Sequence, residues 1–199
     1  MSQKTIPRPG GRSARVQAAV HQASAALIEE IGRDALTVPL IAARAGVTPS
    51  TIYRRWGDLA ELLADLALGR MRADAPPLDT GSVAGDLHAW AEQYMEEMAS
   101  QVGLSMMRDV VAASAGGANC QCAALVAGQI ELIVGRAAAR GEAAPAVEAV
   151  MDGVVAPIIY RALFGPRAPT HEQVDALVER CIKSARAETP ARTASPPPR

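Results

Sequence analysis

Residues 46–56, GVTPSTIYRRW, place three aliphatic hydroxyls, a tyrosine and two adjacent arginines in one short stretch. Hydroxyl and guanidinium groups are the side chains that hydrogen-bond phosphate oxygens and base edges. The Thr48-Pro49 pair predicts a helix start, because threonine caps a first turn and proline suits the first position. The positive end of such a helix also favours a phosphate. The stretch therefore indicates a short helix that binds a polyanion, although any surface helix of a bundle can carry similar residues.

The residue types that perform catalysis or bind metals are scattered. They are His21, His88, His171, Cys120, Cys122 and Cys181. On a helix, the C-x-C pair points its thiols in divergent directions and has no second pair nearby, which makes a weak metal site. We therefore expect no enzyme activity, no metal and no cofactor. Idle cysteines are the main interpretation, with a thiol sensor at Cys120 as a minor alternative.

The charge of the chain is unevenly distributed. Residues 1–56 hold eight Lys or Arg against three Asp or Glu, a net charge of +5, whereas the remainder has a net charge of −6. A basic N-terminal region followed by an acidic remainder suggests that the N-terminal region binds a polyanion. The alternative is a solvated surface that happens to be uneven. An odd cysteine count, and the lack of a signal peptide or an uninterrupted apolar span, predict a cytoplasmic protein without a membrane partner.

The composition predicts an all-α fold. Hydrophobic residues make up 49% of the chain and aromatic residues only 3%. Alanine favours helices, whereas aromatic and β-branched residues favour strands. The first helix should begin at Ser13 and end at Gly32. Its apolar stripe consists of Val16, Val20, Ala23, Leu27 and Ile31.

Three helices should follow in the DALTVPLIAARAGVTPSTIYRRWGDLAELL region. Thr37 caps the first of them, with Pro39 in its first turn, and Gly46 supplies the tight turn after it. The second turns Val47, Ile52 and Trp56 inward and ends at Gly57; Asp58 caps the third, residues 59–73. Two short helices joined by a glycine turn predict a helix-turn-helix.

The rest of the chain should form a helical bundle. A junction at residues 75–82 precedes five helices, and both chain ends, residues 1–12 and 188–199, should be disordered. Pro157 should kink the fourth of these helices. The five helices are expected at residues 82–101, 104–115, 119–140, 145–164 and 170–187.

The stretch LTVPLIAARAGVTPSTIYRRWGDLAELL resembles the DNA-binding domain of the tetracycline-repressor (TetR) family, and ARGEAAPAVEAVMDGVVAPIIYRALFGP resembles a common C-terminal domain of that family. The resemblance implies about nine helices. Residues 13–75 would form a three-helix helix-turn-helix domain with a linking fourth helix, and residues 76–187 a ligand-binding and dimerisation bundle. Members of the family are homodimeric transcription regulators, usually repressors.

The resemblance also implies which residues bind DNA. One departure is Leu59, which stands where the family often has a phosphate-binding lysine. We expect Arg55, or the basic arm with Lys4, Arg8 and Arg12, to compensate. The DNA-binding residues are expected to be Thr37, Thr48, Pro49, Ser50, Thr51, Tyr53, Arg54 and Arg55.

A ligand cavity in the bundle is expected from the same resemblance. Methionines adapt to irregular shapes, and a few polar groups in an apolar interior are typical of ligand sites. The alternative is that these residues are plain core. Dimerisation is expected through the last two helices, where Gly153 and Ala156 permit close approach. The candidate ligand-binding residues are Trp90, Tyr94, Met98, Met107, Val110, Gln129 and Met151.

These expectations combine into one function. The chain should be a homodimeric repressor, released from a near-palindromic DNA operator by a small, largely apolar effector. The two helix-turn-helix heads of such a dimer would lie about 34–36 Å apart. The alternatives are a helical small-molecule-binding protein that does not bind DNA and, with less support, an enzyme with a helical active site.

Overall fold

The computed structural model describes residues 11–72, 76–113 and 117–188 of the 199-residue chain, and these are helical without a strand. The all-α fold class is confirmed. The described residues divide into two units, of which the first holds the chain up to Arg70 together with residues 109–113 and 117–119. The expected arm and tail lie outside the described residues, except for Gly11, Arg12 and Glu188.

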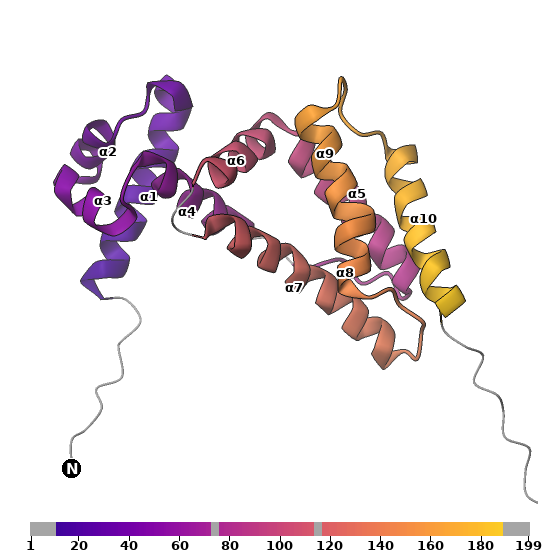
Figure 1. Ribbon diagram of the computed structural model, residues 1–199. Helices are drawn as coiled ribbons and strands as arrows, with labels where there is room; N and C mark the ends of the chain where they lie inside the picture. The colour runs from indigo at the N-terminus through magenta and orange to yellow at the C-terminus, as the bar shows by residue number, and fades with distance from the viewer. Residues whose placement is uncertain (1–10, 73–75, 114–116, 189–199) are drawn as a thin grey trace, which may run out of the picture. The chain divides into compact units, whose positions relative to one another are not determined.

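The first unit is built from four helices and a short 3₁₀ turn, Arg33–Ala35. Its helices are α1 (Arg12–Ile31), α2 (Val38–Ala45), α3 (Pro49–Trp56) and α4 (Leu59–Arg72) (Figure 1). Their apolar faces enclose one core, and a helix with such a face is stable only when that face is covered. The buried core residues are Val20, Ala23, Leu27, Leu36, Val38, Ile41, Ala42, Ile52, Leu62, Leu63 and Leu66.

Most of the stripe predicted on α1 faces this core, but Ile31 does not. Val20 and Leu27 are buried, whereas Ile31 is 46% exposed. The reason is local: Ile31 is the last residue of α1, and Gly32 turns the chain away with a φ of +80°. The prediction that Ile31 lies in the buried stripe is therefore wrong.

The helix-turn-helix has the glycine turn that the sequence predicts. Gly46 has a φ of +67°, and the N–H of Val47 donates to the carbonyl of Ala42 at 3.0 Å. Such a φ is open to glycine at little cost and strained for other residues. The expected inward residue of α3, Ile52, is fully buried.

Two of the three predicted helix caps form. The hydroxyl of Thr37 accepts from the N–H of Leu40 at 3.4 Å, and the carboxylate of Asp58 accepts from the N–H of Glu61 at 2.9 Å. Thr48 occupies the N-cap position of α3 with extended backbone, but its side chain makes no capping hydrogen bond. The prediction of a side-chain cap there is wrong, because the Thr48 hydroxyl bonds neighbouring hydroxyls instead.

The second unit is a helical bundle, and it begins at Met71, within the last turn of α4 (Figure 1). Along it, α10 packs against α5 and the π-helical turn, and α9 also packs against α5. The last residues of α6, from Asp109, belong to the first unit. Its elements are α5 (Val83–Ala99), α6 (Gln101–Ala112), α7 (Ala118–Ala139), α8 (Val147–Val150), the π-helical turn (Met151–Val155), α9 (Ala156–Phe164) and α10 (His171–Glu188).

The predicted helix 145–164 is present as α8, the π-helical turn and α9 in succession. The N–H of Ala156 donates to the carbonyl of Met151, five residues back. Proline has no N–H, and its ring clashes with the carbonyl four residues before it in an α-helix. The wide turn just ahead of Pro157 accommodates both features. With α8 and α9 counted as one interrupted helix, the described chain has nine helices.

The turn between α5 and α6 is tighter than the sequence predicts. The gap expected at residues 102 and 103 is absent, because α6 already begins at Gln101. The hydroxyl of Ser100 accepts from the N–H of Gly103 at 2.9 Å, and a Cβ at Gly103 would collide with the carbonyl of Glu97. Only glycine fits at that close approach of two helices.

A buried carboxylate fastens the start of α5. Asp86 is fully buried and accepts from the N–H of Thr80 at 2.6 Å, from its hydroxyl at 2.7 Å, and from Arg140 at 3.2 Å. Burial pushes the pKa of Asp86 up, but the bonds from Thr80 and Arg140 outweigh it and the net pKa lies below its ordinary value. An ionised, satisfied carboxylate therefore anchors the loop before α5.

The helix α7 is long and apolar enough to span a membrane by length and composition alone, over Cys120–Ala139. Four of its residues, Val126, Ile130, Ile133 and Ala137, lie in the core of the bundle. Core helices of soluble proteins can meet the same length and composition criterion.

Candidate nucleic-acid interface

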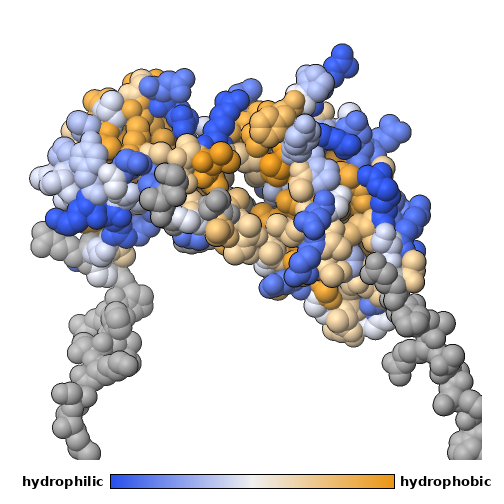
Figure 2. Space-filling view, viewed as in Figure 1, coloured by the Kyte–Doolittle hydropathy of each residue, from blue (hydrophilic) through white to orange (hydrophobic). Residues whose placement is uncertain are grey.

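The outer face of α3 carries the polar residues expected to bind DNA. Tyr53 is 50% exposed, Arg54 is exposed, and Thr51 is half-buried. Figure 2 shows a mainly hydrophilic surface where α3 lies. A groove of about 940 Å³ runs between the starts of α1 and α3. It is lined by Ser13, Val16, Gly46, Val47, Thr48, Thr51, Arg54 and Arg55.

Three hydroxyls gather at the start of α3. The Thr48 Oγ1 lies 2.9 Å from Ser50 Oγ and 3.0 Å from Thr51 Oγ1. Pro49, beside them, is exposed and lies at the first helical position, where its missing N–H costs nothing. The arrangement presents rotatable hydroxyl donors beside the positive end of a helix, which suits an anionic oxygen.

Thr37 opens α2 and is exposed. Its oxygen accepts from a backbone N–H of its own helix, and the hydroxyl hydrogen can rotate to donate to another group. A phosphate beside this position would meet that donor and the N-terminal end of α2 together.

Arg55 behaves differently from Arg54. One of its terminal nitrogens, Nη1, donates to the carbonyl of Ser13 at 3.1 Å and to the hydroxyl of Ser13 at 2.7 Å. The other, Nη2, donates to Gln17 Oε1 at 2.5 Å. The guanidinium also lies over the ring of Trp56, 5.1 Å from its centroid. The side chain of Arg55 is thus directed toward α1.

A carboxylate on α4 completes this arrangement. Asp65 Oδ2 accepts from the indole N–H of Trp56 at 2.8 Å and from Gln17 Nε2 at 3.0 Å, and it lies 3.0 Å from His21 Nε2. The hydrogen bond with His21 contributes most to lowering the pKa of Asp65 to about 2, burial opposes it, and the bonds from Trp56 and Gln17 add to it. Asp65 is therefore ionised at neutral pH.

Sequence reasoning missed this group. Asp65 lies in the LLADLAL stretch as a single charge within an apolar helix, and Gln17 and His21 are four residues apart on α1. The spacing places Gln17 and His21 on one face of α1. Nothing in the sequence says that this face meets α4 and α3.

The candidate ligand-binding residues lie mainly in the core of the second unit. Trp90 and Tyr94 stack with ring centroids 5.2 Å apart, and the indole N–H of Trp90 donates to Gln129 Oε1 at 2.8 Å. Met98 and Met107 are buried in the same cluster. Burial, with smaller contributions from Cys122 and Glu97, raises the pKa of Tyr94.

Two candidate residues lie elsewhere. Met151 is half-buried and packs against the same cluster from the π-helical turn. Val110 is buried but belongs to the end of α6 that counts with the first unit. Trp90, Tyr94 and Gln129 therefore lie together in the second unit, and Val110 is counted with the first.

One face of the segment that runs from α8 through α9 is exposed and apolar. On α9, Tyr160 is 66% and Phe164 72% exposed, with ring centroids 5.5 Å apart. Figure 2 shows hydrophobic surface where α9 lies. The same face continues through small exposed residues at 149, 153 and 156.

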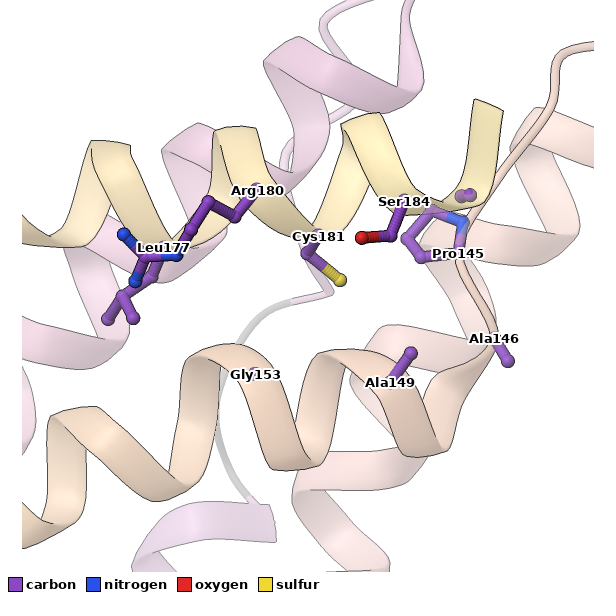
Figure 3. A pocket seen from close by; sticks show the side chains of 9 residues that line it. Pro145, Ala146, Ala149, Gly153, Leu177, Arg180, Cys181 and Ser184 are labelled. Atoms are coloured by element: carbon purple, nitrogen blue, oxygen red, sulfur yellow. The ribbon is translucent and has the colours of Figure 1, made fainter. Parts of the chain in front are cut away.

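A groove of about 230 Å³ lies between α8, the π-helical turn and α10. Figure 3 shows Cys181 and Ser184 of α10 facing Ala149 and Gly153 across it. Apart from Leu177 and Arg180, the side chains that line it are short, so a neighbouring helix can approach closely beside them. The groove is lined by Pro145, Ala146, Ala149, Gly153, Leu177, Arg180, Cys181, Ser184 and Ala185.

The described part of the chain has no group of three or more His, Cys, Asp or Glu placed to hold a metal ion. Cys120 is exposed, Cys122 is half-buried and Cys181 is buried. Burial raises the pKa of the Cys122 and Cys181 thiols, which makes both poorer nucleophiles.

A glycine turn between two short helices, the second with a polar and cationic outer face, defines a helix-turn-helix DNA-binding protein. Residues 21–66 match the bacterial regulatory proteins of the tetR family, and residues 77–181 match the tetracyclin repressor-like C-terminal domain. The chain belongs to the TetR family of transcriptional regulators.

Individual relatives agree with this assignment. The HTH-type transcriptional regulator AqdR of Rhodococcus erythropolis is 35% identical over 112 residues, and the match spans 54% of each chain, about half the length of AqdR. The uncharacterized HTH-type regulator Rv1556 of Mycobacterium tuberculosis is 32% identical over 163 residues, which are 78% of this chain and 80% of that protein.

Solved structures show the same fold. The TetR family regulator SCO0332 superposes with a TM-score of 0.66 at 22% identity, over 85% of this chain and 97% of that one. FadR of Thermus thermophilus, a TetR-family repressor in complex with lauroyl-CoA, superposes with a TM-score of 0.60 at 16% identity, over 92% and 99%.

Proposed function

We propose that this regulator is a cytoplasmic homodimeric repressor. It binds a near-palindromic operator through α3, and a small, largely apolar effector releases it. The observation that supports the DNA-binding part is the outer face of α3, where exposed hydroxyls lie at the positive helix end and Tyr53 and Arg54 are exposed further along the helix. Such a face combines phosphate and base-edge donors on a helix short enough to enter a major groove.

The residues of this face divide by role. Arg54 and Tyr53, exposed along α3, read base edges or contact flanking phosphates. Thr48, Ser50 and Thr51 donate from their hydroxyls at the helix start, with Pro49 in van der Waals contact with the DNA. Thr37 donates to a backbone phosphate at the start of α2.

The dimer forms through the exposed face of α8, α9 and α10. Along α8 and α9 the exposed residues change from small (Ala149, Gly153, Ala156) to aromatic (Tyr160, Phe164). When the two-fold axis is perpendicular to α9, the α9 helices of two copies run antiparallel, and the aromatic end of one meets the small end of the other. Such a face is complementary to itself, and its occupant is a second copy of the chain.

The effector binds in the core of the second unit. Trp90, Tyr94 and Met98 offer aromatic and adaptable apolar surface, and the bond between Trp90 and Gln129 offers one polar group that a ligand can take over. The lauroyl-CoA bound by FadR is a ligand with a long apolar chain. By analogy with its fold, we place the apolar part of the effector beside Trp90.

Release of DNA requires that the effector bind two conformations unequally. The helix α6 begins in the second unit and ends in the first, where Arg33 Nε donates to Asp109 Oδ1 at 2.7 Å. Asp109 is only 5% exposed, so this ion pair is desolvated on one side. An effector that shifts α6 would act on the DNA-binding unit through this pair.

The test is fluorescence anisotropy with the DNA upstream of the regulator's own gene, a scrambled duplex, and the best duplex from a random-sequence selection. Selective binding whose logarithm falls with the logarithm of salt, with a slope of about −0.9 per neutralised phosphate, supports the proposal. The Arg54→Ala variant should bind the selected duplex more weakly, and Arg70→Ala, which also changes an exposed arginine in the same unit, serves as the control. Failure to bind any duplex at low salt would contradict DNA binding and favour a small-molecule-binding protein instead.

A further inference from the structure

The recognition helix α3 is weakly anchored by apolar packing. It has eight residues, and Ile52 is its only fully buried side chain. Trp56, at the end of the helix, packs against the same core but is only partly buried. So few apolar contacts resist translation of a short helix better than they resist tilting or rotation. The orientation of α3 must therefore depend on other contacts, and base-edge hydrogen bonds require that orientation to be accurate.

Polar contacts at the end of α3 supply this constraint. Trp56, the last residue of α3, donates to Asp65 of α4, and the same carboxylate oxygen accepts from Gln17 of α1. Gln17 in turn accepts from Arg55 of α3. The amide of Gln17 thus joins the two, and one oxygen of Asp65 lies at the meeting point of three helices.

Two further side chains, His21 and Arg55, lie beside the ring of Trp56. His21 of α1 lies 3.0 Å from the same oxygen of Asp65 and 6.1 Å, between centroids, from the ring of Trp56. Arg55 lies over that ring and is bonded to Ser13. The indole N–H is therefore held by Asp65 of α4, while His21 of α1 and Arg55 of α3 itself lie beside its ring.

We propose that Asp65 is a positioning residue for DNA recognition: with Gln17, Arg55 and Trp56 it fixes the orientation of α3, and so the ability of the regulator to distinguish its operator from other DNA. The proposal rests on the proposed DNA binding. It also assigns Arg55 a role different from that of Arg54, because the donors of Arg55 are directed to α1 and the exposed side chain of Arg54 remains for the DNA.

Charge supports this division between the two arginines. Asp65 is ionised and is joined to Arg55 through Gln17. Its negative charge therefore offsets much of the attraction between Arg55 and a DNA phosphate. A residue that neutralises a phosphate contributes about −0.9 to the salt slope of binding, whereas a positioning residue contributes none. The two roles are therefore separable by measurement.

The first experiment is a double-mutant cycle on the full chain with Trp56→Phe and Asp65→Ala. Trp56→Phe keeps an aromatic ring but removes the N–H together with the rest of the five-membered ring. It should bind the selected duplex about fivefold more weakly, which corresponds to one hydrogen bond, and Asp65→Ala should lose at least as much because its contacts with Gln17 and His21 are also removed. Because both variants break the same contact, the double variant should resemble Asp65→Ala and should not show the product of the two losses.

The readout that separates positioning from general destabilisation is the ratio of affinities for selected and scrambled duplexes. Phosphate contacts tolerate a tilted helix, whereas base-edge contacts do not, so the ratio should fall in both single variants. Asp65→Asn, which keeps an acceptor oxygen, should restore part of it. The control is the exposed ion pair between Glu30 and Arg44, whose Arg44→Ala variant should leave the ratio unchanged.

The second experiment compares Arg54→Ala with Arg55→Ala. Arg54→Ala should reduce the magnitude of the salt slope by about one phosphate, whereas Arg55→Ala should keep the slope and lower the affinity ratio. Equal changes in slope would overturn the positioning role of Arg55. If the affinity losses of Trp56→Phe and Asp65→Ala add in the double variant, or if the ratio of affinities for selected and scrambled duplexes is unchanged, the positioning role of Asp65 is overturned.

Hydrogen exchange of the protein without DNA gives a test that is independent of the operator. Asp65→Ala should speed exchange of the backbone amides near Tyr53 and Trp56, with unchanged exchange in the second unit. If Asp65→Ala speeds this exchange but the unaltered chain binds no duplex, the proposed function fails. The contacts of Asp65 then hold α3 in place without a role in DNA recognition. If exchange at α3 is unchanged, Asp65 does not hold α3 in place and the proposal is refuted. Should Asp65→Ala fail to fold, Asp65→Asn and Trp56→Phe provide the same comparison.

Discussion

At the scale of single residues, the chemistry of the DNA-binding unit depends on which partner each polar group meets. Arg54 and Arg55 are adjacent and chemically identical, yet the structure directs Arg55 to Ser13 and Gln17 on α1. Asp65 is the one carboxylate among these groups, and its pKa is low because several side chains hydrogen-bond to it. The identity of a side chain thus sets what it can bind, and its neighbours set what it does bind.

The pKa of Asp65 leads to a prediction about stability and pH. A carboxylate whose folded-state pKa is lowered stabilises the folded state above its unfolded pKa, and this contribution is lost as pH falls through the folded-state pKa. The unaltered chain should therefore be more stable than Asp65→Asn by about 1 kcal/mol at pH 7. The difference should shrink between about pH 4 and about pH 2.

Urea denaturation of both proteins at a series of pH values measures this difference. Glu29→Gln, which alters an exposed carboxylate on α1, is the control and should show no comparable trend. A stability difference that stays constant down to pH 2 would contradict the ionised hydrogen-bonded state of Asp65.

At the scale of elements, glycines decide where helices begin, end and approach one another. Gly46 makes the turn of the helix-turn-helix with its positive φ, and Gly103 allows α6 to start directly after α5. Gly135, in contrast, lies in the interior of α7 with open space where a Cβ would be. Its lack of a side chain only costs conformational entropy.

Alanine substitutions at these two helical glycines should have opposite effects. Gly103→Ala should destabilise the second unit by about 1–3 kcal/mol, because its Cβ collides with the carbonyl of Glu97. Gly135→Ala should stabilise it by about 0.5–1 kcal/mol, since alanine favours a helix interior. Chemical denaturation followed by circular dichroism measures both, and a destabilising Gly135→Ala would show that α7 is covered on that face.

At the scale of the whole molecule, the exposed face of α8, α9 and α10 is the feature that a single chain leaves unexplained. The helix α9 has apolar residues on almost all of its sides, and two of them, Tyr160 and Phe164, are largely exposed. Water contact of two neighbouring aromatic rings is unfavourable, and burial of such residues dominates interface energetics. A second copy covers them in the proposed dimer.

Disrupting this face should separate the dimer. Phe164→Asp and Tyr160→Asp should each weaken self-association at least about tenfold, because a carboxylate would be buried in an apolar interface. Leu132→Asp, which places the same charge at a residue 50% exposed on α7, is the control. Sedimentation velocity over a range of concentrations measures the dissociation constant.

The DNA affinity should follow the dimer. A monomer presents one recognition helix to one half-site, so the Phe164→Asp variant should lose most of its operator affinity at concentrations where it is monomeric. If both aspartate variants remain dimeric, or if Leu132→Asp separates the dimer as well, the assignment of the interface to α9 is wrong.

Much of this architecture follows from local rules along the chain. The threonine-proline and glycine signals place the ends of α2 and α3, the spacing of Val20, Ala23 and Leu27 places the buried face of α1, and the motif around residues 36–63 identifies the family. These features depend on neighbours within a few residues, which is why they can be predicted without the fold.

The tertiary structure decided the rest. It directed Arg55 toward α1, joined Asp65 to Trp56, and placed Val110 with the first unit. Helical periodicity shows which residues share a face, but the rotation of that face against other helices depends on how all the helices pack together. The sequence alone therefore determined the kind of protein and its helices, whereas only packing decided which polar side chains meet.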